Sequence, residues 1–173
     1  MNSETRTFKY LAGYSEEIQR KVAQLVDGGK LTEALLKKYP APHDVRTDAA
    51  LYDFTMEIKN EYLKKSQPVS KVIFDPTISD VNRALGLHSF VSRVQGAKLK
   101  AKNEIRVASL FKTAPAAFLR MIVVHELAHL KEKEHNKAFY NLCEHMEPEY
   151  HQLEFDTRLY LTHLDLAGPL YAG

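Results

Sequence analysis

The sequence predicts an α+β fold in which a small, mostly antiparallel sheet packs on one buried helix and the N-terminal part is helical. Residues 15–66 contain apolar side chains at the 3.6-residue spacing of amphipathic helices. Residues 69–109 contain segments that alternate between apolar and polar side chains, which is typical of strands. Residues 114–130 are apolar on nearly every face, so we expect them to form a helix at the centre of the protein.

The length and composition are those of one globular domain. The 173 residues are 45% hydrophobic and 27% charged, and they suffice for a substantial core. We therefore predict a single domain over residues 1–173, with a helical part at 1–67 and a second part at 68–173 that carries the chemistry. The net charge of +2 is too small to indicate a polyanionic partner by itself.

The cysteine content and the hydropathy of the sequence indicate in which cellular compartment the protein is expected. Cys143 is the only cysteine, so an intrachain disulfide is excluded and a reducing compartment such as the cytoplasm is expected. Residues 1–14 contain no apolar run of the signal-peptide type, and no stretch approaches the roughly 18 apolar residues of a membrane helix. We expect neither export nor membrane contact.

Three helices are predicted in the N-terminal part. Ser15 can cap the first of them, which places four apolar residues on its buried face: Ile18, Val22, Leu25 and Val26. The second helix is short, over about 31–36, and must end before Pro40. The third runs from about Asp44 to Ser66, where apolar residues recur along one stripe.

Four strands and three further helices are predicted in the second part. The strands are expected at four places: 69–75, 88–95, 97–101 and 104–109. The last two of these strands would form a hairpin. The central helix follows at 114–130, with Pro115 near its first turn. Asn136 is a suitable cap for a helix that ends near Met146, and a last helix is expected over about 149–164.

The central helix contains the run H-E-L-A-H at residues 125–129. Histidines four positions apart lie on one face of a helix, one turn apart, so His125 and His129 can bind one Zn²⁺ together. Glu126 projects in a neighbouring direction and would reach a water molecule at the metal rather than the metal itself. Such a carboxylate can act as the general base of a hydrolase.

A third ligand requires the chain to turn. On a continuous helix His135 would lie about 15 Å along the axis from His125, which is too far for the two to share a metal. His135 can be a ligand if the helix ends near 130–133 and the chain folds back. The alternative third ligand is an acidic residue further along, Glu147 or Glu149. Three protein ligands would leave a fourth position for water, as in catalytic sites, and would hold one Zn²⁺ per chain.

The stretch from Glu104 to Leu161 resembles the YgjP-like metallopeptidase domain family, which is related to the SprT-like and WLM zincins. The resemblance is carried by the strand E-I-R-V-A, the block H-E-L-A-H-L and the segment H-N-K-A-F-Y that follows. It implies a zincin-like fold and a zinc ion that is held by three histidines: His125, His129 and His135. It also implies that Glu126 is the catalytic base.

Other residues are weaker candidates. Four further histidines could add ligands, although single histidines are more often solvated or structural: His88, His145, His151 and His163. Three side chains could stabilise an oxyanion, although tyrosines at helical spacing are more often core residues: Tyr150, Arg158 and Tyr160. Five cationic residues gather around the predicted hairpin: Arg93, Lys98, Lys100, Lys102 and Arg106. A solvated hairpin is the simplest interpretation of these charges, and contact with a nucleic acid or a nucleotide is the alternative.

The function that the sequence favours is zinc-dependent hydrolysis of a peptide bond, with a peptide or protein as substrate. Glu126 would take the proton of the attacking water and pass it to the leaving amine. The same metal site could instead hydrolyse a nucleotide phosphoanhydride, with the cationic hairpin holding the phosphates. A third possibility is a non-catalytic zinc module that binds DNA or protein, but a structural zinc site has no need of a base such as Glu126.

Overall fold

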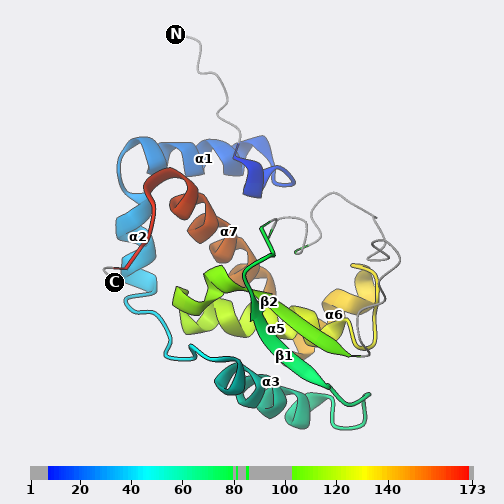
Figure 1. Cartoon of the computed structure of the whole chain (residues 1–173). Helices are drawn as coiled ribbons and strands as arrows, with labels where there is room; N and C mark the ends of the chain where they lie inside the picture. The colour runs from blue at the N-terminus through cyan, green and yellow to red at the C-terminus, as the bar shows by residue number, and fades with distance from the viewer. Residues whose placement is uncertain (1–7, 80, 82–84, 86–102, 172–173) are drawn as a thin grey trace.

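The computed structural model describes residues 8–79, 81, 85 and 103–171. Within these ranges the chain forms six α-helices, two short 3₁₀ helices and one two-stranded sheet (Figure 1), which confirms the α+β class. The N-terminal helices are α1 (Glu16–Asp27), α2 (Leu31–Lys38) and α3 (Asp48–Tyr62). The second part contains β1 (Lys71–Asp75), β2 (Glu104–Ala108), α5 (Ala116–Ala128), α6 (Lys137–Met146) and α7 (Tyr150–Ala167). The 3₁₀ helices are Lys9–Leu11 and Ser109–Thr113. Among the helices of the described ranges, none is long and apolar enough to span a membrane.

Side-chain caps begin three of the helices. The Ser15 hydroxyl accepts the backbone N–H of Ile18 at 3.3 Å at the start of α1, as the sequence predicts. The Asn136 side chain accepts the N–H of Phe139 at 2.9 Å at the start of α6, again as predicted. Thr47 caps α3 in the same way. Capping therefore fixes where these helices begin.

α3 is shorter than the helix predicted over 44–66. His43 explains its late start, because its backbone N–H donates to the Ala114 carbonyl at 3.1 Å and its ring accepts the Val45 N–H at 2.9 Å. These bonds hold the preceding segment out of the helix. At the other end, Leu63 leaves the helix and buries its side chain, which is 3% exposed.

β1 and β2 pair in parallel, with Val72 opposite Ile105 and Phe74 opposite Val107. All four of these apolar side chains are buried, as period-two strands with one inner face require. The antiparallel arrangement expected from the sequence is wrong for this pair. Parallel strands cannot be joined by a tight turn, so their pairing implies a long connection between them.

The strand boundaries also differ from the prediction. The strand expected at 104–109 ends at Ala108, where the second 3₁₀ helix begins. This strand pairs with β1. The hairpin expected between this strand and residues 97–101 stays a prediction. The strands predicted at 88–95 and 97–101 lie outside the described residues.

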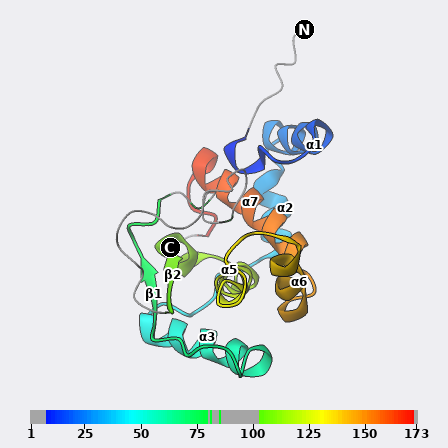
Figure 2. The same ribbon diagram turned by 90° about the vertical axis from the view of Figure 1, so that its right-hand side faces the viewer.

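α5 lies at the centre of the molecule. It contacts α6 and α7 as well as β2 and α3, and 10 of its 13 residues are buried. Figure 2, in which α5 is seen nearly end-on, shows the strands on one side of it and α6 and α7 on the other. The helix is apolar on nearly all its faces because other elements surround it, as the sequence predicts.

Polar contacts fix the N-terminal part on α7. Asp156 of α7 accepts hydrogen bonds from the Tyr39 hydroxyl at 2.5 Å and from the Lys38 ammonium at 2.7 Å. The fully buried guanidinium of Arg158 donates to the Tyr10 carbonyl at 3.1 Å. The N-terminal helices thus support α7, which in turn packs against α5.

Candidate metal centre

Three imidazoles converge at the C-terminal end of α5, where His125 lies in the last turn and His129 follows the helix. The Nε2 atom of His125 lies 3.2 Å from that of His129 and 3.1 Å from that of His135, and the last two are 3.1 Å apart. In the ranges that the structure describes, no other group of three or more histidine, cysteine or carboxylate side chains has the geometry to hold a metal ion. His125 is fully buried and the other two are partly exposed, so the cluster remains accessible from solvent.

A turn of the backbone brings the third histidine to the other two. α5 ends at Ala128, and the N–H groups of Lys131 and Glu132 both bond to the Ala128 carbonyl, at 3.1 and 2.9 Å. The helix therefore ends slightly before the position that the sequence predicts. The chain then folds back, as the geometric argument requires, and places His135 beside the helix before Asn136 caps α6.

The donor set fits a zinc ion. Two nitrogens bound tetrahedrally to zinc at about 2.0–2.1 Å are separated by about 3.3 Å. The three separations between Nε2 atoms, 3.1, 3.1 and 3.2 Å, are close to this value. Three mutually adjacent ring nitrogens cannot form a hydrogen bond in every pair, because each hydrogen bond needs one donor and one acceptor. At least one pair must bring together two donors or two acceptors. A cation relieves the repulsion between their lone pairs, although the identity of the ion as zinc stays a prediction.

Contacts on the outer side of the rings hold two of the imidazoles in place. Nδ1 of His129 lies 2.9 Å from the Glu132 carbonyl oxygen, and Nδ1 of His125 lies 2.8 Å from the Tyr150 hydroxyl. The ring of Phe139 packs on the imidazoles of all three histidines, at centroid distances of 4.8, 4.5 and 5.0 Å. Partners of this kind commonly orient metal-binding histidines.

Glu126 follows His125 directly in the sequence. It is buried, but it does not belong to the cluster. Its side chain is 6% exposed, and its carboxylate is not among the atoms that converge. A glutamate that directly follows a metal-binding histidine in such a motif, without binding the metal itself, can act as a general base. The catalytic role of Glu126 stays a prediction.

The two acidic alternatives for the third ligand lie outside the cluster. The Glu147 carboxylate lies 3.4 Å from the Arg120 guanidinium and also accepts the Glu149 N–H at 3.4 Å. Neither glutamate belongs to the cluster. The arrangement therefore favours His135 as the third group.

The histidines outside the motif do not join the cluster either. His145, His151 and His163 each contact a different residue: Tyr62, Glu144 and Thr32, respectively. None of these three belongs to the metal-binding group found in the described residues. His88 lies outside the residues that the structure describes.

The three candidates for oxyanion stabilisation have different surroundings. Tyr150 contacts the triad, and burial raises the pKa of its phenol well above the ordinary value, so the hydroxyl stays protonated. Arg158 is fully buried, with its guanidinium 3.0 Å from the Glu154 carboxylate. The Tyr160 hydroxyl donates to the Thr113 carbonyl at 3.5 Å. These contacts give Arg158 and Tyr160 roles in holding the fold.

Arg106 belongs to the cationic set and lies within the described residues. Its guanidinium is 2.9 Å from the Asp75 carboxylate and 2.9 Å from that of Glu104. The charge of Arg106 is therefore balanced within the sheet. The other members of the set, Arg93, Lys98, Lys100 and Lys102, lie outside the described residues, and contact of this set with a nucleic acid or a nucleotide stays a prediction.

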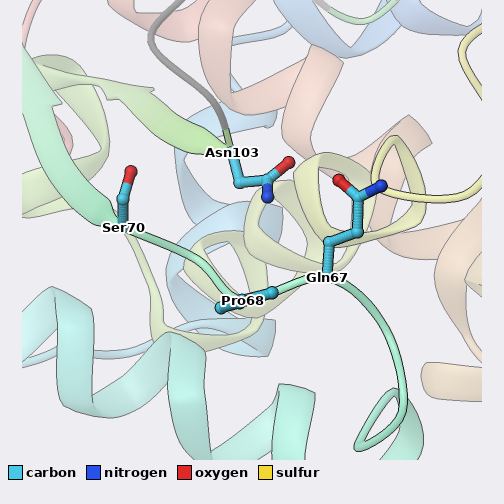
Figure 3. A pocket seen from close by; sticks show the side chains of 4 residues that line it. All are labelled: Gln67, Pro68, Ser70 and Asn103. Atoms are coloured by element: carbon cyan, nitrogen blue, oxygen red, sulfur yellow. The ribbon is translucent and has the colours of Figure 1, made fainter.

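A separate cavity of about 390 Å³ lies where the two strands begin. It is lined by Gln67, Pro68, Ser70 and Asn103 (Figure 3). Asn103 has a left-handed backbone conformation, with φ of 61°, which asparagine adopts more readily than most residues. No histidine of the triad lines this cavity, so it is distinct from the metal centre.

Known proteins resemble this chain over the segment that carries the triad and well beyond it. The YgjP-like metallopeptidase domain matches residues 78–157, which include the three histidines and Glu126. A protein of Escherichia coli (strain K12) named UTP pyrophosphatase is 60% identical over 157 residues, which cover 91% of this chain and 94% of that protein. Such coverage must include most of the residues that form the N-terminal helices of this chain. No solved structure matches the chain, and the zincin-like fold stays a prediction. On the family match and this extensive identity, the chain belongs to the YgjP-like metallopeptidase domain family.

Proposed function

We propose that the protein is a metal-dependent hydrolase that cleaves a phosphoanhydride bond of a nucleoside triphosphate, with UTP as the first substrate to test. Hydrolysis is supported by the convergence of three imidazoles next to the buried Glu126. The choice of substrate is supported by the 60% identity to a protein named UTP pyrophosphatase. This observation favours the nucleotide over the peptide that the sequence alone suggests.

Each side chain of the site has a defined task in this proposal. His125, His129 and His135 would hold the ion, and a bound zinc ion would supply a Lewis acid that polarises a phosphoryl oxygen and acidifies water. Glu126 would accept a proton from the attacking water. As the water oxygen bonds to the α-phosphorus of UTP, the bond from that phosphorus to the bridging oxygen breaks. The products are UMP and pyrophosphate, and Glu126 returns its proton to solvent or to the leaving group.

Peptide hydrolysis is the second candidate, and the description of the family as a metallopeptidase domain favours it. The same three histidines and Glu126 would serve, with the proton passing from water through Glu126 to the leaving amine. The two candidates differ in what else must be bound. A triphosphate needs cationic partners, whereas an extended peptide needs backbone hydrogen bonds.

Substrate profiling of the zinc-loaded protein decides between the candidates. UTP, CTP, ATP, GTP and dUTP would be compared with a peptide library, using phosphorus NMR for the nucleotide products and mass spectrometry for the peptides. We expect UMP and pyrophosphate from UTP, with the activity lost on chelation and in Glu126→Gln. Glu147→Gln is the matched control and should keep the activity, because Glu147 contacts Arg120 rather than the triad.

Two other results would contradict this proposal. Peptide cleavage that depends on Glu126, with no nucleotide hydrolysed, would establish the metallopeptidase instead. Zinc binding with neither activity would favour the non-catalytic binding module.

A further inference from the structure

The hydroxyl of Tyr150 makes a fully enclosed contact with the triad. It lies 2.8 Å from Nδ1 of His125, and both side chains are 0% exposed. The contact is therefore shielded from bulk solvent. The two ring planes differ by only 19° with centroids 6.4 Å apart, so the rings meet edge to edge, as an in-plane hydrogen bond to a ring nitrogen requires.

Metal binding requires one particular tautomer of His125. Its Nε2 atom faces the Nε2 atoms of His129 and His135, so this nitrogen must present a lone pair to the ion and Nδ1 must carry the proton. The Tyr150 oxygen is placed to accept the hydrogen bond of that Nδ1–H group. If the hydroxyl donated to Nδ1 instead, the imidazole proton would sit on Nε2 and would block the ion.

The hydroxyl proton of Tyr150 has a possible acceptor other than His125. The thiol of Cys143, on α6, is a second polar group beside the Tyr150 hydroxyl, and it is fully buried. Sulfur is a weak acceptor, but in an enclosed space it offers the phenol proton an alternative to Nδ1. A phenol proton directed at the sulfur would leave the Tyr150 oxygen free to accept the Nδ1–H of the tautomer that can bind a metal.

His129 is oriented by a different kind of partner. Its Nδ1 atom contacts the backbone carbonyl of Glu132, which can only accept a hydrogen bond and which no side-chain substitution removes. The partner of His125 is a side chain from the first residue of α7, 25 positions further along the chain. A single substitution can therefore remove one of these supports and leave the other.

We propose that Tyr150 is a positioning residue that fixes the metal-competent tautomer and the ring orientation of His125. The inference rests on the metal site of the proposed function but not on the identity of the substrate. It differs from a role in stabilising an oxyanion, because the hydroxyl is enclosed and engaged by His125.

Zinc affinity gives the first test. Tyr150→Phe keeps the ring and removes only the hydroxyl, and loss of such a partner typically weakens metal binding by roughly 10–100-fold. We expect a loss in this range, measured by competition with a chromophoric chelator. Tyr160→Phe is the matched control, because Tyr160 is also a buried tyrosine of α7 but its hydroxyl contacts the Thr113 carbonyl. The control should bind zinc like the parent protein.

Nitrogen-15 NMR of the metal-free protein gives a readout that a mere loss of packing would not move. At a pH where the ring is neutral, we expect the parent His125 to carry its proton on Nδ1, and Tyr150→Phe to show a mixture of tautomers. A proton on Nε2 of the parent His125 would overturn the proposal, as would parent-like zinc affinity in a folded Tyr150→Phe. If that variant does not fold, the spectrum of the parent decides alone.

Failure of this inference can be told apart from failure of the proposed function. A parent protein that hydrolyses UTP, with a Tyr150→Phe variant that binds zinc as the parent does, would retain the function and lose the role of Tyr150. If the parent instead binds zinc in a Tyr150-dependent way but hydrolyses no nucleotide, the role of Tyr150 is retained and the proposed function is lost.

Discussion

The Nε2 atoms of His125 and His135 lie 3.1 Å apart although the two residues are ten positions apart in the chain. They meet because the backbone leaves the helix after Ala128 and the next helix begins only at Lys137. The proposed metal site therefore depends on this turn as much as on the H-E-L-A-H run.

His135→Ala should weaken zinc binding by about ten-fold or more, because two imidazoles would remain where three close the donor set. The parent protein, purified without chelator, should retain about one zinc ion per chain by elemental analysis. Glu147→Ala serves as the control and should retain the same amount, since the Glu147 carboxylate is held by Arg120. The reverse pattern, with metal lost only from the glutamate variant, would assign the third ligand to the acidic side chain.

Glu126→Gln should bind zinc normally and hydrolyse the substrate more slowly by about 10²–10⁴-fold. Glutamine has nearly the same shape as glutamate but cannot take a proton from water at neutral pH. Zinc content and turnover would be measured on the same preparation, so that a defect in loading is separated from a defect in chemistry. Full activity of this variant on a confirmed substrate would rule out the general-base role.

Arg158→Met should reduce the free energy of unfolding by about 3–5 kcal/mol, because it leaves the Glu154 carboxylate buried without its cation. Urea unfolding measures this loss. The rate per folded molecule should stay that of the parent, because Arg158 holds Tyr10 and Glu154 rather than the substrate. Arg158→Lys provides the contrast, since full stability combined with a large loss of rate in that variant would instead indicate a catalytic cation.

His43 should make the folded protein less stable at acidic pH. Burial lowers the pKa of His43 below its ordinary value of 6.5, and the neutral ring both donates from Nε2 to the Phe111 carbonyl and accepts the Val45 N–H. Above pH 6.5 the contribution is fully present, because neither the folded nor the unfolded state is protonated there. As the pH falls through 6.5 the unfolded chain binds the proton first, so the free energy of unfolding decreases until the lowered pKa is reached.

Urea midpoints of metal-free protein between neutral and mildly acidic pH would measure this effect. His43→Gln cannot titrate, so its stability should fall less steeply with pH than that of the parent. The triad histidines are the same in both proteins, and their contribution cancels in the difference. Equal slopes for the two proteins would show that His43 does not titrate as its burial implies.

Features with local causes could be predicted from the sequence. Ser15 and Asn136 begin helices because their side chains accept nearby N–H groups. His125 and His129 share a face because they are four positions apart on a helix. The return of the chain at His135 could be inferred because a metal site of three histidines would require it, and the polar run before His135 permits a turn.

Features that depend on how elements dock could not be predicted in the same way. Strand propensity in β1 and β2 does not reveal which strand pairs with which, or in which direction. The sequence suggested a mostly antiparallel sheet, whereas β1 and β2 pair in parallel. The contact of Tyr150 with His125 likewise follows from the docking of α7 on α5, and helical periodicity indicates only that Tyr150 faces the core.

The closeness of the three histidines in the sequence has a consequence for the order in which the protein folds. An ion that joins residues ten positions apart closes a short loop, whose entropic cost is small. The sheet, by contrast, brings together residues such as Asp75 and Arg106, which are 31 positions apart. Non-local pairings of this kind form more slowly than local contacts. If the triad binds an ion as proposed, its capture can precede formation of the sheet and would draw α5 and α6 together early in folding.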